Sequence, residues 1–273
     1  MIILKKKKIF FCLFIFFAIF IILGVDNRLI IKKYNVNSNK VKQKIKLVFI
    51  ADLHNCKYGT KQEELINEIN EIKPDVILFG GDIVDDKIPD TNTRFLLEGL
   101  KNYPSYYVTG NHEYWSENVD YIKKMFKSFG VKVLEGECSK VLIGNQAIEI
   151  AGIDDFEAGR ENVFSQISKA NNQSTKELYT VFLSHRPEYI KKYLDYNFDL
   201  ILSGHAHGGQ WRLPGIINGL YAPGQGMFPK YAGGKYNFES KVFIVSRGLA
   251  RESTRIPRFF NRPELVVINI LPK

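Results

Sequence analysis

The chain has 273 residues and a formal net charge of +9, so it is long enough for one large domain, or two small ones, with a substantial core. The charge is unevenly spread, because residues 1–46 hold eleven of the 38 Lys and Arg but only one of the 29 acidic residues. Residues 47–273 are left with 27 basic and 28 acidic side chains, which excludes a general nucleic-acid footprint, and we expect no nucleic-acid partner. The three cysteines, Cys12, Cys56 and Cys138, do not form the pattern of a disulfide framework.

An apolar segment near the N-terminus predicts a membrane anchor. Lys5–Lys8 precede Ile9–Val25, which is apolar apart from Cys12 and Gly24 and would be roughly 26 Å long as a helix. The core of a cleaved signal peptide is the alternative, but no small-x-small cleavage site follows the segment. We therefore expect an uncleaved anchor over residues 1–26.

The residues that flank this segment predict how the rest of the chain is placed. Four lysines precede the span and three basic residues follow it closely, which slightly favours a cytoplasmic N-terminus. The expected location is the cell membrane, with a single span and the main domain on the extracytoplasmic side. Residues 27–43 are polar, rich in Asn and Lys and without apolar periodicity, which predicts a basic polar linker before a domain over 44–273.

The first half of this domain alternates predicted strands with predicted helices. Apolar runs at 48–50, 76–79 and 106–108 predict buried strands, and helical spacing follows each of them. The capping-box pattern from Thr60 to Glu63 precedes the first helical segment. This alternation predicts a layered α/β domain. The predicted helices cover residues 60–72, 92–101 and 116–129.

After residue 130 the pattern changes to hairpins. Apolar runs flank a Gly144-Asn145 turn, which predicts antiparallel strands. Residues 208–235 are rich in Gly, Pro and aromatic residues and predict long loops at the rim of the domain. Runs at 241–246 and 265–271 are expected to close the second of two sheets. The other predicted elements of this half are strands at 131–134, 140–143, 147–153, 179–183 and 200–202, and a helix near 163–170.

Polar residues follow five of the apolar runs, and all five histidines of the chain lie among them. The carboxyl ends of strands are where α/β proteins place their sites, and imidazole, carboxylate and carboxamide groups are ligands for divalent ions. Scattered core or solvated histidines would not keep this order, so the pattern predicts a metal site. The candidate ligands are Asp52, His54, Asp82, Asn111, His185, His205 and His207.

These blocks resemble the calcineurin-like metallophosphoesterase family, whose pattern runs D-x-H, G-D, G-N-H-[DE], a lone His and G-H-x-H. All five blocks occur in that order between Asp52 and His207, and the part from Gly208 onward is similar to membrane-anchored bacterial phosphodiesterases. The resemblance implies an α/β fold of the α+β sandwich kind. Two packed mixed sheets, flanked by helices, would carry a dinuclear metal site at one edge.

Seven candidate ligands are too many for one tetrahedral ion, and they suit two divalent ions that share a bridge. Mn²⁺, Fe²⁺, Zn²⁺ and Co²⁺ all suit such ligands, so the identity of the ions stays open. Matched to the family pattern, the first ion is held by Asp52, His54 and His207, the second by Asn111, His185 and His205, and both by Asp82.

The resemblance also implies a reaction and a role for His112. The expected enzyme is a phosphoesterase of the phosphodiesterase or pyrophosphatase type, in which a metal-bridging hydroxide attacks phosphorus in line. His112 would be the catalytic residue that stabilises the transition state or protonates the leaving oxygen, and Glu113 would orient its imidazole. A phosphomonoesterase acting on protein or nucleotide, or a non-catalytic metal-binding scaffold at the membrane, is the alternative.

The C-terminal stretch 247–262 carries five arginines together with Phe259 and Phe260. Arginine binds phosphate and exposed aromatic residues suit a membrane interface, which suggests a lipid or lipid-linked envelope precursor as the phosphate-ester substrate. An ordinary salt-bridged rim is the alternative for this stretch.

Overall fold

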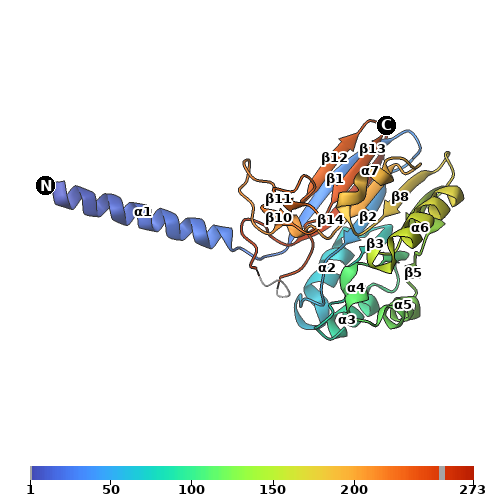
Figure 1. Ribbon diagram of the computed structural model, residues 1–273, viewed down its shortest axis with the longest axis horizontal. Coiled ribbons are helices and arrows are strands. Elements are labelled where there is room, and N and C mark those ends of the chain that lie inside the picture. The colour runs from blue at the N-terminus through green and yellow to red at the C-terminus, as the bar shows by residue number, and fades with distance from the viewer. Residues whose placement is uncertain (1, 252–255) are drawn as a thin grey trace.

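Two six-stranded β-sheets form the centre of the molecule, as the computed structural model describes it over residues 2–251 and 256–273 (Figure 1). The first sheet is mixed, because β14 runs antiparallel to β2 while the other neighbours are parallel. Its strands, in spatial order, are β1 (Ile30–Ser38), β14 (Glu264–Pro272), β2 (Ile45–Ile50), β3 (Val76–Gly80), β4 (Ser105–Val108) and β5 (Lys132–Val133).

The second sheet is also mixed, with antiparallel pairs at its two edges and parallel pairs in the middle. The predicted hairpin around Gly144-Asn145 is present as β6 and β7. The strands of this sheet, in spatial order, are β12 (Gly234–Phe238), β13 (Lys241–Val245), β9 (Leu200–Ser203), β8 (Tyr179–Leu183), β7 (Gln146–Gly152) and β6 (Glu137–Ile143).

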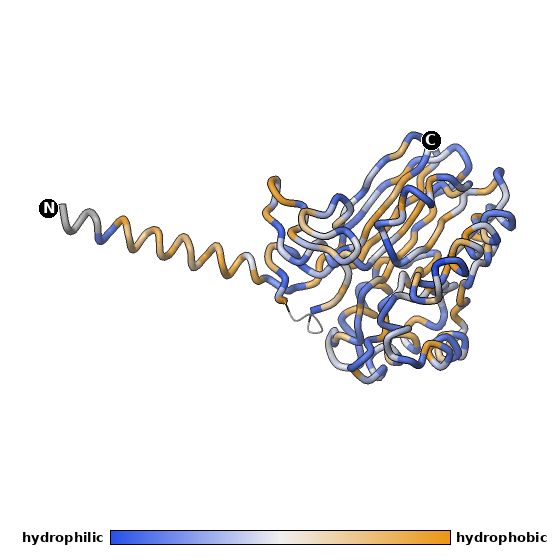
Figure 2. Tube along the Cα trace, in the orientation of Figure 1, coloured by the Kyte–Doolittle hydropathy of each residue, from blue (hydrophilic) through white to orange (hydrophobic). Residues whose placement is uncertain are grey.

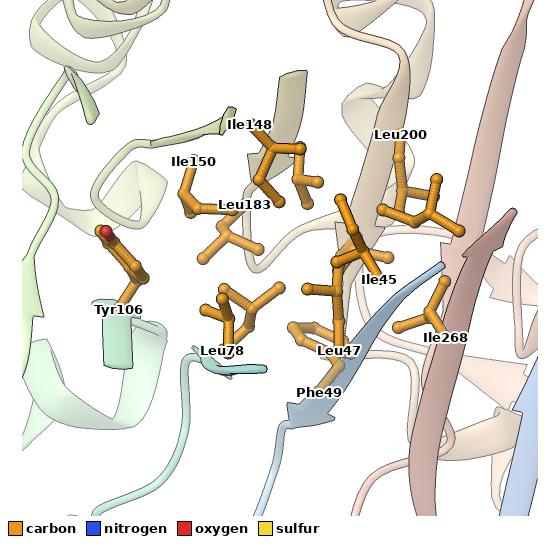
Figure 3. Packing of buried hydrophobic residues seen from close by; sticks show 14 of the residues in the cluster. Ile45, Leu47, Phe49, Leu78, Tyr106, Ile148, Ile150, Leu183, Leu200 and Ile268 are labelled. Carbon is orange, nitrogen blue, oxygen red and sulfur yellow. The ribbon is translucent and has the colours of Figure 1, made fainter. Parts of the chain in front are cut away.

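The two sheets pack face to face over an apolar core (Figure 3). Strand side chains alternate between faces, so in β2 the side chains of Ile45, Leu47 and Phe49 enter this core. The intervening Val48 and Ile50 point to the other face of the sheet, where helices cover them. Apolar side chains on both faces explain why β2 is a continuous hydrophobic run in the sequence.

Helices cover the outer face of each sheet. On the first sheet these are α2 (Glu63–Ile72), α3 (Thr91–Leu100) and α5 (Val119–Ser128), and on the second α6 (Arg160–Gln173) and α7 (Ile190–Tyr193). The predicted sandwich of two mixed sheets flanked by helices is therefore confirmed. Helix α2 begins at Glu63 rather than Thr60, because Lys61 and Gln62 have positive φ angles of 52° and 64°.

The last strand of the chain lies in a different sheet from the one predicted. Residues 265–271 were expected to close the second sheet, but β14 pairs with β1 and β2 in the first. An apolar run predicts that a buried strand forms, but it does not predict which strands pair with it, because pairing depends on contacts between segments far apart in the chain. Here Ile268 lies opposite Leu47, more than two hundred residues earlier in the sequence.

The predicted linker over 27–43 is also wrong in part, since β1 adds an edge strand to the first sheet. Most residues in the second half of this strand are polar and exposed. There, only Tyr34 and Val36 show the alternate spacing of apolar residues that indicates an inward face. Val36 and Val41 are both buried in the core between the sheets. Residues 30–38 therefore belong to the folded domain.

We expect removal of residues 1–43 to destabilise the protein, whereas removal of 1–25 spares the sheet. The chain without residues 1–43 lacks β1 and two buried valines, and the edge of β14 is exposed. Each buried valine contributes about 1.5–3 kcal/mol, so we expect the free energy of unfolding to fall by about 3 kcal/mol or more. Urea unfolding of the two truncations measures this difference. Equal midpoints would show that β1 adds no stability.

Helix α1 (Ile2–Gly24) projects from the rest of the molecule (Figures 1 and 2). Its segment Lys7–Gly24 has a mean hydropathy of 2.4 and is long and apolar enough to cross a membrane. Most of its side chains are exposed, unlike those of a core helix in a soluble protein. The N-terminal segment therefore has the properties of a single membrane span.

Candidate metal centre

The predicted site residues follow the carboxyl ends of strands in both sheets. Asp52 and His54 come after β2, and Asp82 comes after β3. The short helix α4 (Asn111–Trp115) follows β4 and begins with Asn111 and His112. In the second sheet, His185 follows β8, while His205 and His207 follow β9. The facing sheets therefore deliver these loops to one edge of the sandwich.

The backbone at this edge is held in an uncommon conformation. Positive φ angles outside glycine are rare and cost about 1–3 kcal/mol each, so they persist where function or surrounding structure requires them. Two glycines permit the close approach of these loops: a Cβ on Gly204 would lie 2.6 Å from Asp52 Oδ2, and one on Gly110 would lie 2.3 Å from Asp82 Oδ1. Five candidate ligands have positive φ, namely Asp52, His54, Asp82, His205 and His207.

Asp82 lies between two groups of candidate ligands. Its Oδ2 is 3.0 Å from His185 Nε2 and 3.7 Å from His54 Nε2, while its Oδ1 accepts a hydrogen bond from the backbone N–H of His112. Three groups of mutually close ligand atoms occur among the described residues: the first from Asp52, His54, Asp82 and His207, the second from Asp82, His185 and His205, and a third from His54, Asp85 and His112. The carboxylate of Asp82 is common to the first two groups.

Hydrogen bonds on the far side of two imidazoles orient them toward this cluster. The Nδ1 atom of His185 lies 2.8 Å from the carbonyl oxygen of Gly80, and Nδ1 of His54 lies 3.2 Å from Oδ2 of Asp85. An Nδ1–H that donates outward leaves Nε2 with its lone pair facing inward, as metal-binding histidines require. Asp85 was not predicted as a site residue, although its place three residues after Asp82 could have indicated it.

The inward-facing polar atoms fit metal ions better than they fit one another. In the described part of the chain, five buried atoms of the candidate ligands make no hydrogen bond, although an unsatisfied buried polar group is costly. The mixture of carboxylate, imidazole and carboxamide oxygen suits divalent ions. The five atoms are Asp52 Oδ2, His54 Nε2, Asn111 Oδ1, His205 Nε2 and His207 Nδ1.

The protonation states of two histidines in the cluster also favour cation binding. Burial and the neighbouring histidines lower the pKa of His205 and of His207 well below the ordinary value, so both imidazoles are neutral. Burial also lowers the pKa of His185, but the Asp82 carboxylate outweighs it and raises that pKa to about 10. Without ions, His185 therefore carries a proton that a metal must displace.

Metal binding should accordingly release a proton and strengthen as the pH rises. Below the His185 pKa of about 10 the protonated imidazole competes with the ion, so affinity should rise by up to about tenfold per pH unit between pH 6 and 9 for one released proton. Calorimetric titration of the ion-free protein with Mn²⁺, in buffers of different ionisation enthalpy, counts the protons. Affinity that does not change with pH would contradict a protonated His185.

His112 lies beside the cluster and has an acidic partner that was not predicted. Its Nδ1 is 2.7 Å from Asp86 Oδ1 and 3.8 Å from Asp85 Oδ2, and its side chain is partly exposed. The prediction that Glu113 orients this imidazole is wrong. Glu113 is buried and accepts hydrogen bonds from backbone N–H groups of the β3 loop and Gly110, because its side chain turns back from α4 toward β3.

Two of the described arginines in the stretch 247–262 are already paired within the fold. Arg258 is buried and donates to carbonyl groups of Ala250 and Gly248, and Arg247 pairs with Glu264 at 2.6 Å. Arg255 lies outside the described residues. The prediction of a phosphate-binding arginine surface is therefore wrong for Arg247 and Arg258, because acidic or carbonyl partners already occupy them.

The sandwich fold brings a buried cluster of potential metal ligands together at its strand ends. The sequence model of the family described as calcineurin-like phosphoesterase matches residues 45–209, which include every predicted ligand. The chain belongs to this family, as its motifs indicated, and it is a metal-dependent enzyme that hydrolyses phosphoric ester bonds.

Known proteins of similar sequence and fold agree with this assignment. The metallophosphoesterase YkuE of Bacillus subtilis is 33% identical over 235 residues, which cover 82% of this chain and 78% of YkuE. Phosphodiesterase YaeI of Escherichia coli is 29% identical over 236 residues, covering 83% of this chain and 82% of YaeI. The solved structure of phosphopantetheinyl hydrolase PptH from Mycobacterium tuberculosis has a TM-score of 0.50 at 14% identity. It covers 80% of this chain and 96% of that chain, a likeness of fold alone.

Proposed function

We propose that the protein is a phosphoesterase of the phosphodiesterase or pyrophosphatase type that uses two divalent ions and acts on a membrane or envelope substrate. The observation that carries the proposal is the position of Asp82 in both groups of candidate ligands. A carboxylate shared by two groups of ligands suits a centre with two neighbouring ions. In the proposed assignment, Asp82 would be a ligand of both ions, Asp52, His54 and His207 would hold one, and Asn111, His185 and His205 would hold the other.

The residues around the ions would have distinct tasks. Two divalent ions at such a centre neutralise charge on phosphate oxygens and lower the pKa of bound water. The backbone N–H of His112 orients the Asp82 carboxylate, and Asp86 accepts a hydrogen bond from His112 Nδ1–H. In the imidazolium form both ring nitrogens carry a proton, so Nε2–H can give its proton to the leaving oxygen while Nδ1–H stays bonded to Asp86. Asp85 holds His54 with Nε2 toward the cluster.

The surroundings of His112 favour a diester over a monoester. Two carboxylates lie beside its ring, since His112 Nδ1 is 2.7 Å from Asp86 Oδ1 and 3.8 Å from Asp85 Oδ2. A monoester carries more negative charge near pH 7 than a diester, so it meets more repulsion from these two carboxylates. The similarity to YaeI, a protein named as a phosphodiesterase, supports the same choice.

Two nitrophenyl phosphates assayed side by side test the reaction type. The full chain, loaded with Mn²⁺, should hydrolyse bis(p-nitrophenyl) phosphate with the higher kcat/KM and p-nitrophenyl phosphate with the lower. Chelation should abolish both activities and added Mn²⁺ should restore them. A higher kcat/KM for the monoester would favour the phosphomonoesterase alternative, and no metal-dependent turnover of either would overturn the proposal.

The location also belongs to this proposal. Helix α1 has the length and composition of one span, and four lysines precede its apolar run at Ile9, which supports a cytoplasmic N-terminus and a catalytic domain outside. A domain held next to a bilayer in this way would encounter phosphate esters of lipids and lipid-linked precursors.

A further inference from the structure

The base of the membrane helix contacts the folded domain through aromatic side chains. The ring of Phe20 lies 5.6 Å from the ring of Phe259 and 4.9 Å from that of Phe260. The backbone N–H of Phe260 donates to the carbonyl oxygen of Gly24 at 2.6 Å. The end of α1 is therefore attached to residues 259–260 rather than joined to the domain by the chain alone.

These contacts determine how deep the domain lies relative to the bilayer. Phe20 lies inside the apolar segment Lys7–Gly24, four residues before its end, which is about 6 Å along a helix. If that segment spans the membrane, a partner of Phe20 lies at the depth of the interface or below it. Phe259 and Phe260 meet this condition through direct ring contact.

An exposed apolar rim continues from this contact. We define it as residues 211–228 together with 256–260. Trp211 packs 5.8 Å from the Phe259 ring and donates from Nε1 to the carbonyl oxygen of Pro257. Backbone hydrogen bonds from Leu220 to Trp211 and from Phe228 to Leu220 hold the loop together. Its exposed apolar side chains are Trp211, Ile216, Tyr221, Met227, Phe228 and Ile256.

The position of the rim matches this connectivity. The β10–β11 hairpin (Tyr221–Ala222 and Gly226–Met227), which belongs to the rim, is drawn on the side of the domain from which α1 projects in Figure 1, and Figure 2 shows apolar stretches on these loops. Two residues after the end of α1, Asp26 forms ion pairs with Arg28 and Arg262. A Trp- and Phe-bearing rim with charged residues next to it is the arrangement that the bilayer interface favours.

The residue that follows the rim is hydrogen-bonded to the backbone of a candidate ligand. Asn261 follows Phe260, is fully buried, and donates from Nδ2 to the carbonyl oxygens of His207 at 2.7 Å and Gln210 at 3.1 Å. Trp211 is the next residue after Gln210. One buried side chain thus connects the candidate ligand loop to residues that contact the span.

We propose that this apolar rim lies in the membrane interface beside α1 and holds the His207 side of the metal centre at the bilayer surface. The occupant of the rim is the lipid interface itself, because the rim is continuous with the contact made by a side chain within the span. A phosphate ester presented at that surface is then the substrate, and this last step rests on the proposed function.

The two tryptophans of the chain test the position of the rim in the intact protein. Trp211 and Trp115 are similarly exposed, at 45% and 52%, but Trp115 lies on α4 beside His112 and outside the rim. Full-length Trp115→Phe and Trp211→Phe variants are placed in nanodiscs of phosphatidylcholine and phosphatidylglycerol, with and without bromine near the top of the acyl chains.

In Trp115→Phe the remaining tryptophan is Trp211. Its fluorescence should be quenched by brominated lipid and should resist quenching by iodide in the water. In Trp211→Phe the remaining tryptophan is Trp115, and its fluorescence should show the opposite response. Equal quenching of both by brominated lipid, or no quenching of Trp211, would overturn the proposal and would leave the proposed function intact.

A second pair of full-length variants tests the consequence for substrate. Ile216→Ser combined with Phe228→Ser makes the rim polar, and Leu142→Ser is the control, since Leu142 on β6 is 72% exposed and Ile216 is 77% exposed. Hydrolysis of phosphatidylglycerol vesicles should fall relative to hydrolysis of bis(p-nitrophenyl) phosphate in the rim variant only. An unchanged ratio would contradict the role of the rim, whereas no diester hydrolysis by any variant, the unsubstituted chain included, would count against the proposed function instead.

Discussion

Asp82→Ala should abolish metal binding and activity together. Its carboxylate lies in both groups of candidate ligands, 3.0 Å from His185 and 3.7 Å from His54, so its removal takes a ligand from each ion. It also removes the acceptor for the His112 N–H, which loosens α4 against the centre. We expect loss of both ions, and of activity by at least the factor of about 10²–10⁴ that removal of a single acid–base group costs.

Metal content per chain and kcat/KM measured on the same preparation check this expectation. Asp120→Ala is the matched control, because Asp120 is an exposed aspartate on α5 outside the cluster. If Asp82→Ala kept one ion at full occupancy, Asp82 would be a terminal ligand, and the proposed bridge would have to be abandoned.

His112→Ala should separate catalysis from metal binding. The imidazole is partly exposed and bonded to Asp86, and its backbone N–H rather than its ring contacts Asp82. The variant should therefore keep its metal and lose about 10²–10⁴ in kcat, the usual contribution of a general acid or base. A substrate with a better leaving group needs less protonation, so it should be less affected by the change.

Asp86→Asn serves as the companion variant. It keeps the His112 ring in place while weakening the charged partner at Nδ1, so it should lower kcat less than His112→Ala and alter the pH dependence of kcat. Loss of metal from His112→Ala would instead make His112 a ligand in the group with His54 and Asp85. The role of proton donor would then fall to another group.

The sequence determined the composition of the centre because ligand chemistry and strand periodicity are local properties. Each polar block follows an apolar run, and a run of five or so apolar residues between turn residues predicts a buried strand wherever it occurs. Asp52, Asp82 and His205 could therefore be placed at strand ends before any contact was known. The layered architecture followed in the same way from the alternation of strand and helix patterns.

Only the tertiary structure decided the partners, because pairing and orientation depend on segments far apart in the chain. The polar, partly exposed β1 has only a weak local pattern in the sequence. It forms a strand because it pairs in parallel with β14, which is far away in the chain. Glu113 is adjacent to His112 in sequence, yet its carboxylate accepts from the β3 loop, and Asp86 takes the place beside the imidazole. The link from α1 through Phe260 and Asn261 to His207 likewise joins the two ends of the chain to its middle, and no local pattern carries such a contact.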